Sequence, residues 1–199
     1  VAVTGRPAPA SRLRAGRRPA HPGAAVRFGC EVHTLENGLK VVLSRDGTVP
    51  LVAVEVLYRV GSKHAPPGMS GLPHLLEHLF FQGSAHVPRQ AHFRLVQETG
   101  GAANASTWFD CTTFYQTVPS SELSLALWLE SDRMGFLDAG LGRESLEIQR
   151  DIILQERRQK LDGRAYGAAI EKLLGMHFPA EHGYARGPVG DPVGLERIT

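Results

Sequence analysis

The sequence has few cysteines, no long apolar run and little net charge, and each shortage excludes a class of protein. Its two cysteines, Cys30 and Cys111, lack C-x-x-C spacing, which argues against a cysteine zinc site or a thiol redox motif. They could still pair in an oxidising compartment, and the sequence leaves both states open. No apolar run approaches a membrane span. The formal charge of +2 gives no case for nucleic-acid binding.

Acidic residues are absent from residues 1–27, a block rich in Arg, Ala and Pro. Such a composition cannot form a packed core, so we expect a disordered extension. Arg-rich, acid-poor sequence is also typical of organellar transit peptides, but the prolines interrupt any amphipathic helix, and a secretory signal's apolar region is missing. We interpret the block as a linker or N-terminal extension of a soluble protein, cytoplasmic or, in a bacterium, periplasmic. The sequence does not fix the compartment.

Residues 28–199 are enough for one domain with a core of ordinary size. Apolar stretches on both sides of Asn37-Gly38 predict a β-hairpin, because Asn-Gly favours the tight turn. The nearly continuous β-branched run at 51–58 predicts a central strand buried on both faces. Further strands are expected at 103–108 and 112–118, and helices at about 89–99, 120–135, 143–161 and 168–177.

The most informative stretch is 71–81, a short apolar helix that carries His74, Glu77 and His78. Residues three and four apart lie on one side of a helix, so these side chains project into about a third of its circumference. Ser70 is the expected N-cap, and Pro73 falls in the first turn, where its missing N–H costs nothing.

The spacing of this stretch is H-x-x-E-H, a pattern found among zinc peptidases. Zinc favours imidazole nitrogen and carboxylate oxygen, and a catalytic site keeps three protein ligands and one open position. Two histidines on one turn would supply two of these ligands. A solvated surface or capping cluster is the alternative, but the apolar residues around the motif predict burial, and buried polar groups need partners.

Several stretches together resemble one family, the pitrilysin type of inverted zinc metallopeptidases, which includes insulin-degrading enzyme and the processing subunit of mitochondrial processing peptidase. The matching stretches are residues 71–83, residues 100–107 with Asp110 and Thr112, and residues 149–159. The similarity runs from about Cys30 to the C-terminus. It implies an α+β fold in which helices cover a mixed or antiparallel sheet.

The resemblance also implies one Zn²⁺ per chain, bound by His74, His78 and Glu156. Glu77 would be the general base that activates a zinc-bound water. Many members of the family have a glutamate at the position of Gln149, two helical turns from Glu156 on the same face. Glutamine can hydrogen-bond a ligand but supplies no negative charge, so we expect it to lower zinc affinity or rate, and we expect Gln149→Glu to change either one modestly.

The strand near 100–107 is implied to receive substrate as an added β-strand, with Asn104, Ala105 and Ser106 at the contact. Its small residues leave one edge uncluttered, although an ordinary sheet strand is the plainer interpretation. Substrates would then be extended peptides or unfolded segments. His177 and His182 lie in or beside the Pro- and Gly-rich segment 178–199, and we interpret them as solvated.

In this family the domain continues past the position of Thr199 and a second, similarly folded domain follows. The resemblance therefore implies that residues 28–199 are an incomplete N-terminal domain, and that a homologous domain or subunit completes the chamber. The expected function is that of a zinc endopeptidase. The alternatives are an inactive half that needs a partner chain, a non-catalytic binding or assembly subunit of the same fold, and a structural zinc domain. The intact His74, Glu77, His78 and Glu156 argue against the non-catalytic subunit, whereas a structural zinc domain would need four protein ligands and an open water position would exclude it.

Overall fold

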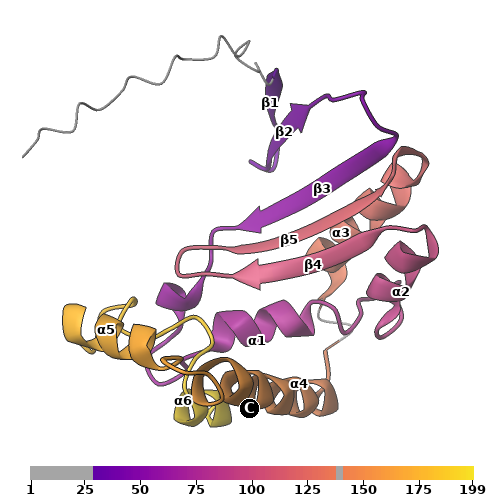
Figure 1. Ribbon diagram of the computed structural model, residues 1–199. Helices are drawn as coiled ribbons and strands as arrows, with labels where there is room; N and C mark the ends of the chain where they lie inside the picture. The colour runs from indigo at the N-terminus through magenta and orange to yellow at the C-terminus, as the bar shows by residue number, and fades with distance from the viewer. Residues whose placement is uncertain (1–28, 138–140) are drawn as a thin grey trace, which may run out of the picture. The chain divides into compact units, whose positions relative to one another are not determined.

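The computed structural model describes residues 29–137 and 141–199, apart from the side chain of Asp162 (Figure 1). The chain divides into two compact units with a boundary after Thr48. The extension predicted at 1–27 lies outside the described residues. In the described part of the chain, no helix combines the length and the apolar character needed to cross a membrane.

The first unit contains the predicted β-hairpin. Strands β1 (Cys30–Thr34) and β2 (Lys40–Ser44) pair antiparallel, with Val32 opposite Val42. The turn between them has Gly38 at φ +86°, a left-handed conformation that glycine adopts without steric cost. The side-chain oxygen of Asn37 accepts a hydrogen bond from the Leu39 amide at 3.1 Å. The Asn-Gly signal is therefore confirmed.

The second unit is built on a three-stranded antiparallel sheet in the order β3-β5-β4. Its strands are β3 (Leu51–Tyr58), β4 (Ala102–Thr107) and β5 (Thr112–Pro119). The expectation that 51–58 is a central strand buried on both faces is wrong, because β3 lies at an edge of the sheet among the described strands and its side chains alternate between exposed and half-buried. An antiparallel sheet covered on one face needs only every second residue to be buried. The central strand is β5.

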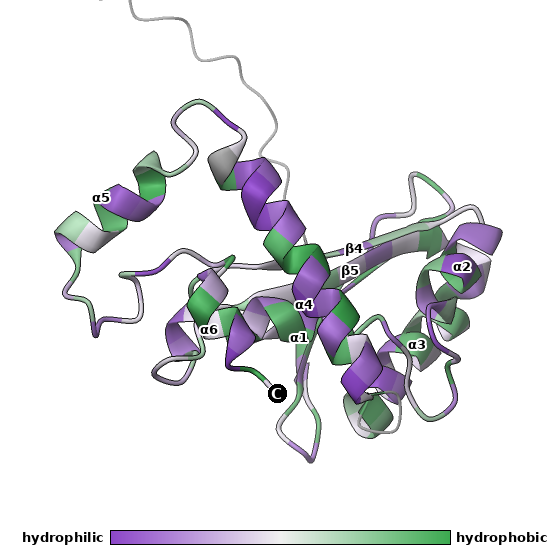
Figure 2. Cartoon of the chain, turned by 90° about the horizontal axis from the view of Figure 1, so that it is seen from below, coloured by the Kyte–Doolittle hydropathy of each residue, from purple (hydrophilic) through white to green (hydrophobic). Residues whose placement is uncertain are grey.

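Helices α1, α2 and α3 pack against this sheet, whereas α4 packs against α1 and α6 packs against α4 (Figures 1 and 2). The helix bounds are α1 Leu72–Leu79, α2 Ala91–Glu98, α3 Leu123–Phe136, α4 Arg143–Arg157, α5 Ala169–His177 and α6 Pro192–Glu196. Short 3-10 turns lie at Ser62–His64 and Ser120–Glu122, and a π turn at Arg158–Asp162 extends α4. This order of elements confirms the predicted α+β class.

Two apolar clusters hold the second unit together. One lies between the sheet, α2 and α3 and includes Val118 and Leu129. The other joins α1, α4 and the C-terminal segment through Leu75, Ile153 and Leu195, which have no exposed surface. Each buried side chain of this size stabilises the fold by about 1.5–3 kcal/mol. The second cluster therefore fixes α4 beside the helix that carries the H-x-x-E-H motif.

The start of α1 differs from the expectation. Its N-cap is Gly71, at φ +91°, and not Ser70, whereas Pro73 does lie in the first turn. A Cβ at position 71 would lie 2.9 Å from a methyl carbon of Leu195 and 3.0 Å from the Val189 carbonyl oxygen. The N-cap position 71 therefore requires glycine, because its φ is positive and because a Cβ would be too close to Leu195 and Val189.

The helix expected at about 120–135 begins later, because Ser120 and Ser121 form a 3-10 turn and the N-cap of α3 is Glu122. In the Pro- and Gly-rich segment 178–199, for which no element was predicted, the structure has α6, whose N-cap Asp191 accepts a hydrogen bond from the Gly194 amide at 2.8 Å. A five-residue helix spans little more than one turn, so it leaves no apolar period in the sequence.

Candidate metal centre

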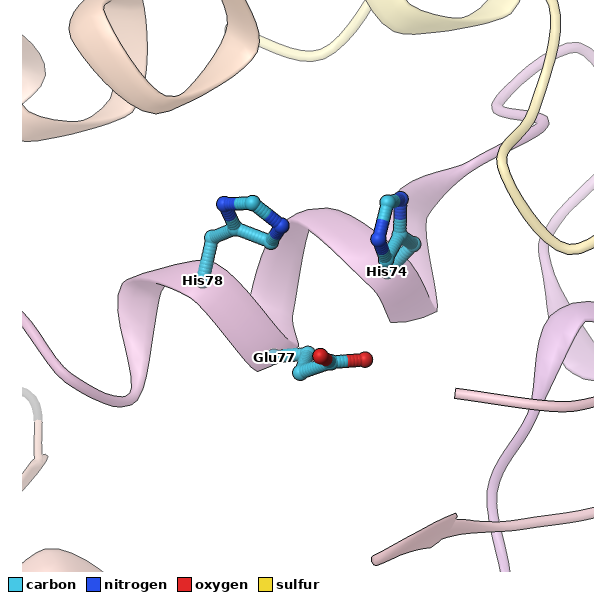
Figure 3. A group of neighbouring side chains, drawn as sticks. All are labelled: His74, Glu77 and His78. Carbon is cyan, nitrogen blue, oxygen red and sulfur yellow. The ribbon is translucent and has the colours of Figure 1, made fainter. Parts of the chain in front are cut away.

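Three of the predicted site residues lie together on α1. His74, Glu77 and His78 each offer a ligand atom, and these atoms lie within 4.8 Å of one another. Figure 3 shows both imidazoles on one side of the helix and the Glu77 carboxylate projecting from the adjacent side. The two rings are nearly perpendicular, at 84°, with their centroids 4.8 Å apart. One helical turn thus presents two nitrogen donors and one carboxylate, as the spacing predicts.

Helix α4 brings a second carboxylate to the two imidazoles. One Glu156 oxygen lies 3.9 Å from Nε2 of His74, and the other lies 3.7 Å from Nε2 of His78. Donor atoms around a tetrahedral zinc ion, with bonds of about 2.0–2.1 Å, are about 3.3 Å apart. Small side-chain shifts would bring these three groups to that separation. The structure therefore brings Glu156, the residue that the family resemblance implies as third ligand, to the two motif histidines.

Gln149 lies on α4 beside the same histidine pair. Its side-chain oxygen is 3.3 Å from Nδ1 of His78, and the residue is buried. An acceptor at Nδ1 favours the tautomer that has its proton there, which leaves Nε2 free as a ligand. Gln149 is thus placed where it can orient His78 toward Glu156.

The environment keeps one imidazole neutral. Burial, followed by repulsion from His78, lowers the pKa of His74 from 6.5 to about 4, although Glu156 opposes this shift. At neutral pH His74 therefore carries a free nitrogen lone pair, which is the form that binds a metal. The buried Nδ1 of this ring makes no hydrogen bond of standard geometry with any described residue.

The two glutamates have opposite pKa shifts. Burial raises the pKa of Glu77, against a hydrogen bond with the Thr107 side chain, and Oε2 of Glu77 has no partner in the described chain. Burial would also raise the pKa of Glu156, but the hydrogen bond and charge of Lys160, together with the charges of His78 and His74, outweigh burial and lower that pKa. Lys160 Nζ donates to Glu156 Oε2 at 2.9 Å. Glu156 is thus the ionised carboxylate suited to a ligand, and Glu77 the carboxylate with the higher proton affinity.

The donor set fits zinc. Two imidazole nitrogens and one ionised carboxylate are the ligands that zinc takes in catalytic sites. The contact between Thr107 and Glu77 was not predicted. Thr107 is the last residue of β4 and α1 packs against this strand, but the sequence has no local signal for a contact between residues so far apart.

The remaining predicted residues lie outside this cluster. Asn104 and Ser106 are exposed and Ala105 is half-buried, all on β4, which pairs only with β5 among the described strands. No described strand pairs with the other edge of β4, so this edge is open to an added strand. His177 and His182 are exposed, as expected, and His182 stacks on the Phe178 ring at 4.8 Å.

Two imidazoles and a carboxylate from two helices, beside a further carboxylate in H-x-x-E-H spacing, form the arrangement that is typical of inverted zinc peptidases. The family model of insulinase (peptidase family M16) matches residues 40–181. The chain therefore belongs to this family, which confirms the predicted resemblance.

Individual relatives agree with this assignment. The zinc protease PqqE of Helicobacter pylori is 32% identical over 158 residues, which are 79% of this chain and 35% of that protein. The crystal structure of a protease from the same bacterium superposes with a TM-score of 0.81 and 29% identity, over 87% of this chain and 41% of that one. Pitrilysin shares the fold, with a TM-score of 0.74 at 23% identity, over 86% of this chain and 18% of its own. The chain thus spans roughly a third of the length of curated relatives such as PqqE.

Proposed function

We propose that this chain is the zinc-binding catalytic part of an endopeptidase that hydrolyses extended peptides or unfolded segments. The observation that carries the proposal is the position of Glu156, which faces the Nε2 atoms of both motif histidines from a different helix. Several of the matching relatives are named zinc proteases, which supports zinc as the metal. His74, His78 and Glu156 would hold one ion per chain.

When bound, zinc polarises the scissile carbonyl and makes a water molecule more acidic. Glu77 takes a proton from water and delivers it to the leaving amine. Its pKa, raised by burial, suits this role, because a general base works best when its pKa is near the working pH. Gln149 holds the His78 ring by its Nδ1 atom and so keeps the Nε2 atom directed at Glu156.

The open edge of β4 is the proposed substrate site. An extended peptide can add to a strand edge through main-chain hydrogen bonds, which explains tolerance of many sequences. β4 contacts α1, and its last residue, Thr107, hydrogen-bonds with Glu77. A peptide that pairs with this edge at Ala105, and passes Asn104 and Ser106 on either side, would therefore run close to the proposed base.

We further propose that a second homologous domain or subunit completes the catalytic chamber. This chain spans only 35% of the PqqE relative and 41% of the H. pylori protease structure. Residues that close the site over the substrate would then come from the remaining part. The proposal predicts zinc binding but slow cleavage for residues 28–199 alone.

Metal content and cleavage of a quenched fluorescent peptide, measured together on the full-length protein, test this function. Glu156→Gln should lower zinc affinity by about a hundredfold or more, because it replaces an ionised ligand by a neutral amide. Glu147→Gln, an exposed glutamate on the same helix, is the matched control and should change neither quantity. A wild-type protein that holds one zinc ion but cleaves no unfolded substrate would instead favour the non-catalytic subunit.

A further inference from the structure

The hairpin register identifies the backbone groups at the open edge of β4. The Trp108 amide donates to the Cys111 carbonyl at 2.9 Å, so these residues form a hydrogen-bonded pair. Pairs alternate along an antiparallel ladder, which makes Thr107 opposite Thr112 a non-hydrogen-bonded pair. The side-chain oxygens of these threonines are 3.2 Å apart, as expected for the closer kind of pair. By the same alternation, Ala103, Ala105 and Thr107 direct their N–H and C=O groups away from β5.

One of these edge donors is already occupied by a side chain of its own strand. The Ala105 amide donates to the side-chain oxygen Oδ1 of Asn104 at 2.9 Å. This oxygen therefore accepts the same hydrogen bond that the carbonyl oxygen of an added strand would accept. Asn104 is exposed, so its side chain has room to rotate away.

We propose that Asn104 is a reversible cap on the substrate edge of β4. Without substrate, its amide oxygen satisfies the Ala105 N–H, which lowers the tendency of an open strand edge to pair with another chain. When an extended peptide binds, a peptide carbonyl replaces the Asn104 oxygen. The cap thus competes with substrate, and Asn104 tunes affinity without being a required contact. This inference rests on the proposed function, because it takes β4 as the substrate strand.

The cap also sets the register of the bound peptide. One peptide residue lies opposite Ala105 and exchanges hydrogen bonds with both its N–H and its C=O. The side chain of that residue points to the same face as Ala105, which is half-buried, whereas its two neighbours point to the exposed face of Asn104 and Ser106. A peptide methylated on the nitrogen of this one residue should therefore lose its binding.

The test compares Asn104→Ala with Asn104→Asp in the full-length, zinc-loaded protein carrying Glu77→Gln, which prevents cleavage. The probe is a fluorescently labelled, unstructured peptide that the wild-type enzyme hydrolyses, and its Kd is measured by anisotropy. Asn104→Ala should tighten binding about fivefold, because the peptide no longer displaces a hydrogen bond. Asn104→Asp should weaken it by a similar factor, since an ionised acceptor holds the amide more strongly. A loss of folding would weaken peptide binding in both variants, so it cannot produce changes in Kd of opposite sign.

Asn37→Ala is the matched control, because Asn37 makes the same kind of bond, to the Leu39 amide, in the hairpin turn. It should leave the Kd unchanged. Hydrogen exchange of the Ala105 amide in the free protein gives a readout independent of the peptide and should be faster in Asn104→Ala. If Asn104→Ala leaves the exchange of the Ala105 amide unchanged, the cap is refuted. The cap is also refuted if Asn104→Ala raises the Kd of the peptide or leaves it unchanged. Neither result contradicts β4 as the substrate strand. A zinc-loaded protein without the Asn104 substitutions that binds no extended peptide overturns the substrate strand and the cap together.

Discussion

A buried histidine on α2 should make this fold sensitive to acid. His92 is 4% exposed, and its ring packs edge-on against Phe81, just after the motif helix, with the centroids 5.3 Å apart. Burial, followed by the positive charge of Arg133, lowers its pKa from 6.5 to about 3, against a hydrogen bond with Gln116. The neutral ring is therefore strongly favoured in the folded chain.

The sign and size of the effect follow from proton linkage. The folded pKa lies below the unfolded one, so the unfolded chain binds the proton more tightly. The contribution of His92 to stability is complete above pH 6.5 and is lost as the pH falls toward 3. Protonation of His92 in the unfolded chain lowers the free energy of unfolding by about 2 kcal/mol at pH 5. The loss reaches about 5 kcal/mol at a pH below both the unfolded and the folded pKa.

Urea denaturation at pH 8 and pH 5 measures this loss. His92→Phe removes the titrating group and keeps a ring of similar size, so the variant should lose about 2 kcal/mol less stability over this interval than the wild type. His74, whose pKa is also lowered, to about 4, is present in both proteins and cancels in the difference. His177→Phe, at an exposed histidine, is the control. Equal losses in wild type and His92→Phe would refute the reasoning.

Three further predictions concern the motif helix and its neighbours. Gly71→Ala should lower the free energy of unfolding by about 1–3 kcal/mol in denaturant titrations, because φ is +91° and a Cβ would lie 2.9 Å from Leu195; unaltered stability would contradict this. Gln149→Glu should tighten zinc binding by up to about tenfold in chelator competition, because a carboxylate at His78 Nδ1 makes the ring more basic, and loss of folding would refute the placement. Lys160→Gln should tighten zinc binding by up to about fivefold, because Lys160 pairs with Glu156 and that exposed pair must be given up. Weaker binding in Lys160→Gln would show that the lysine supports the site.

Most of the site residues could be predicted from their local spacing in the sequence. The three residues on α1 follow from one helical turn, and the two turns between Gln149 and Glu156 place both on one face of α4. Their approach to α1 depends on the cluster of Leu75, Ile153 and Leu195. No local pattern reveals that contact, so the third ligand was predicted from the family resemblance.

The errors share a physical cause. The apolar run of β3 indicated a strand but not its neighbours, and an edge strand can be as rich in β-branched residues as a central one. Ser70 is a good capping residue, yet Leu195 and Val189, far along the chain, leave room only for a glycine at position 71. Tertiary contacts decided both cases, and a single sequence does not display them.

Anomalous X-ray diffraction at the zinc edge, from crystals of the zinc-loaded protein, tests the central claim most directly. We expect one zinc peak with three protein ligands, at about 2.0–2.2 Å from Nε2 of His74, Nε2 of His78 and a Glu156 oxygen. We also expect a position open to solvent and a Glu77 carboxylate that does not contact the metal. A fourth protein ligand, coordination by Glu77, or a peak elsewhere in the chain would contradict this metal site.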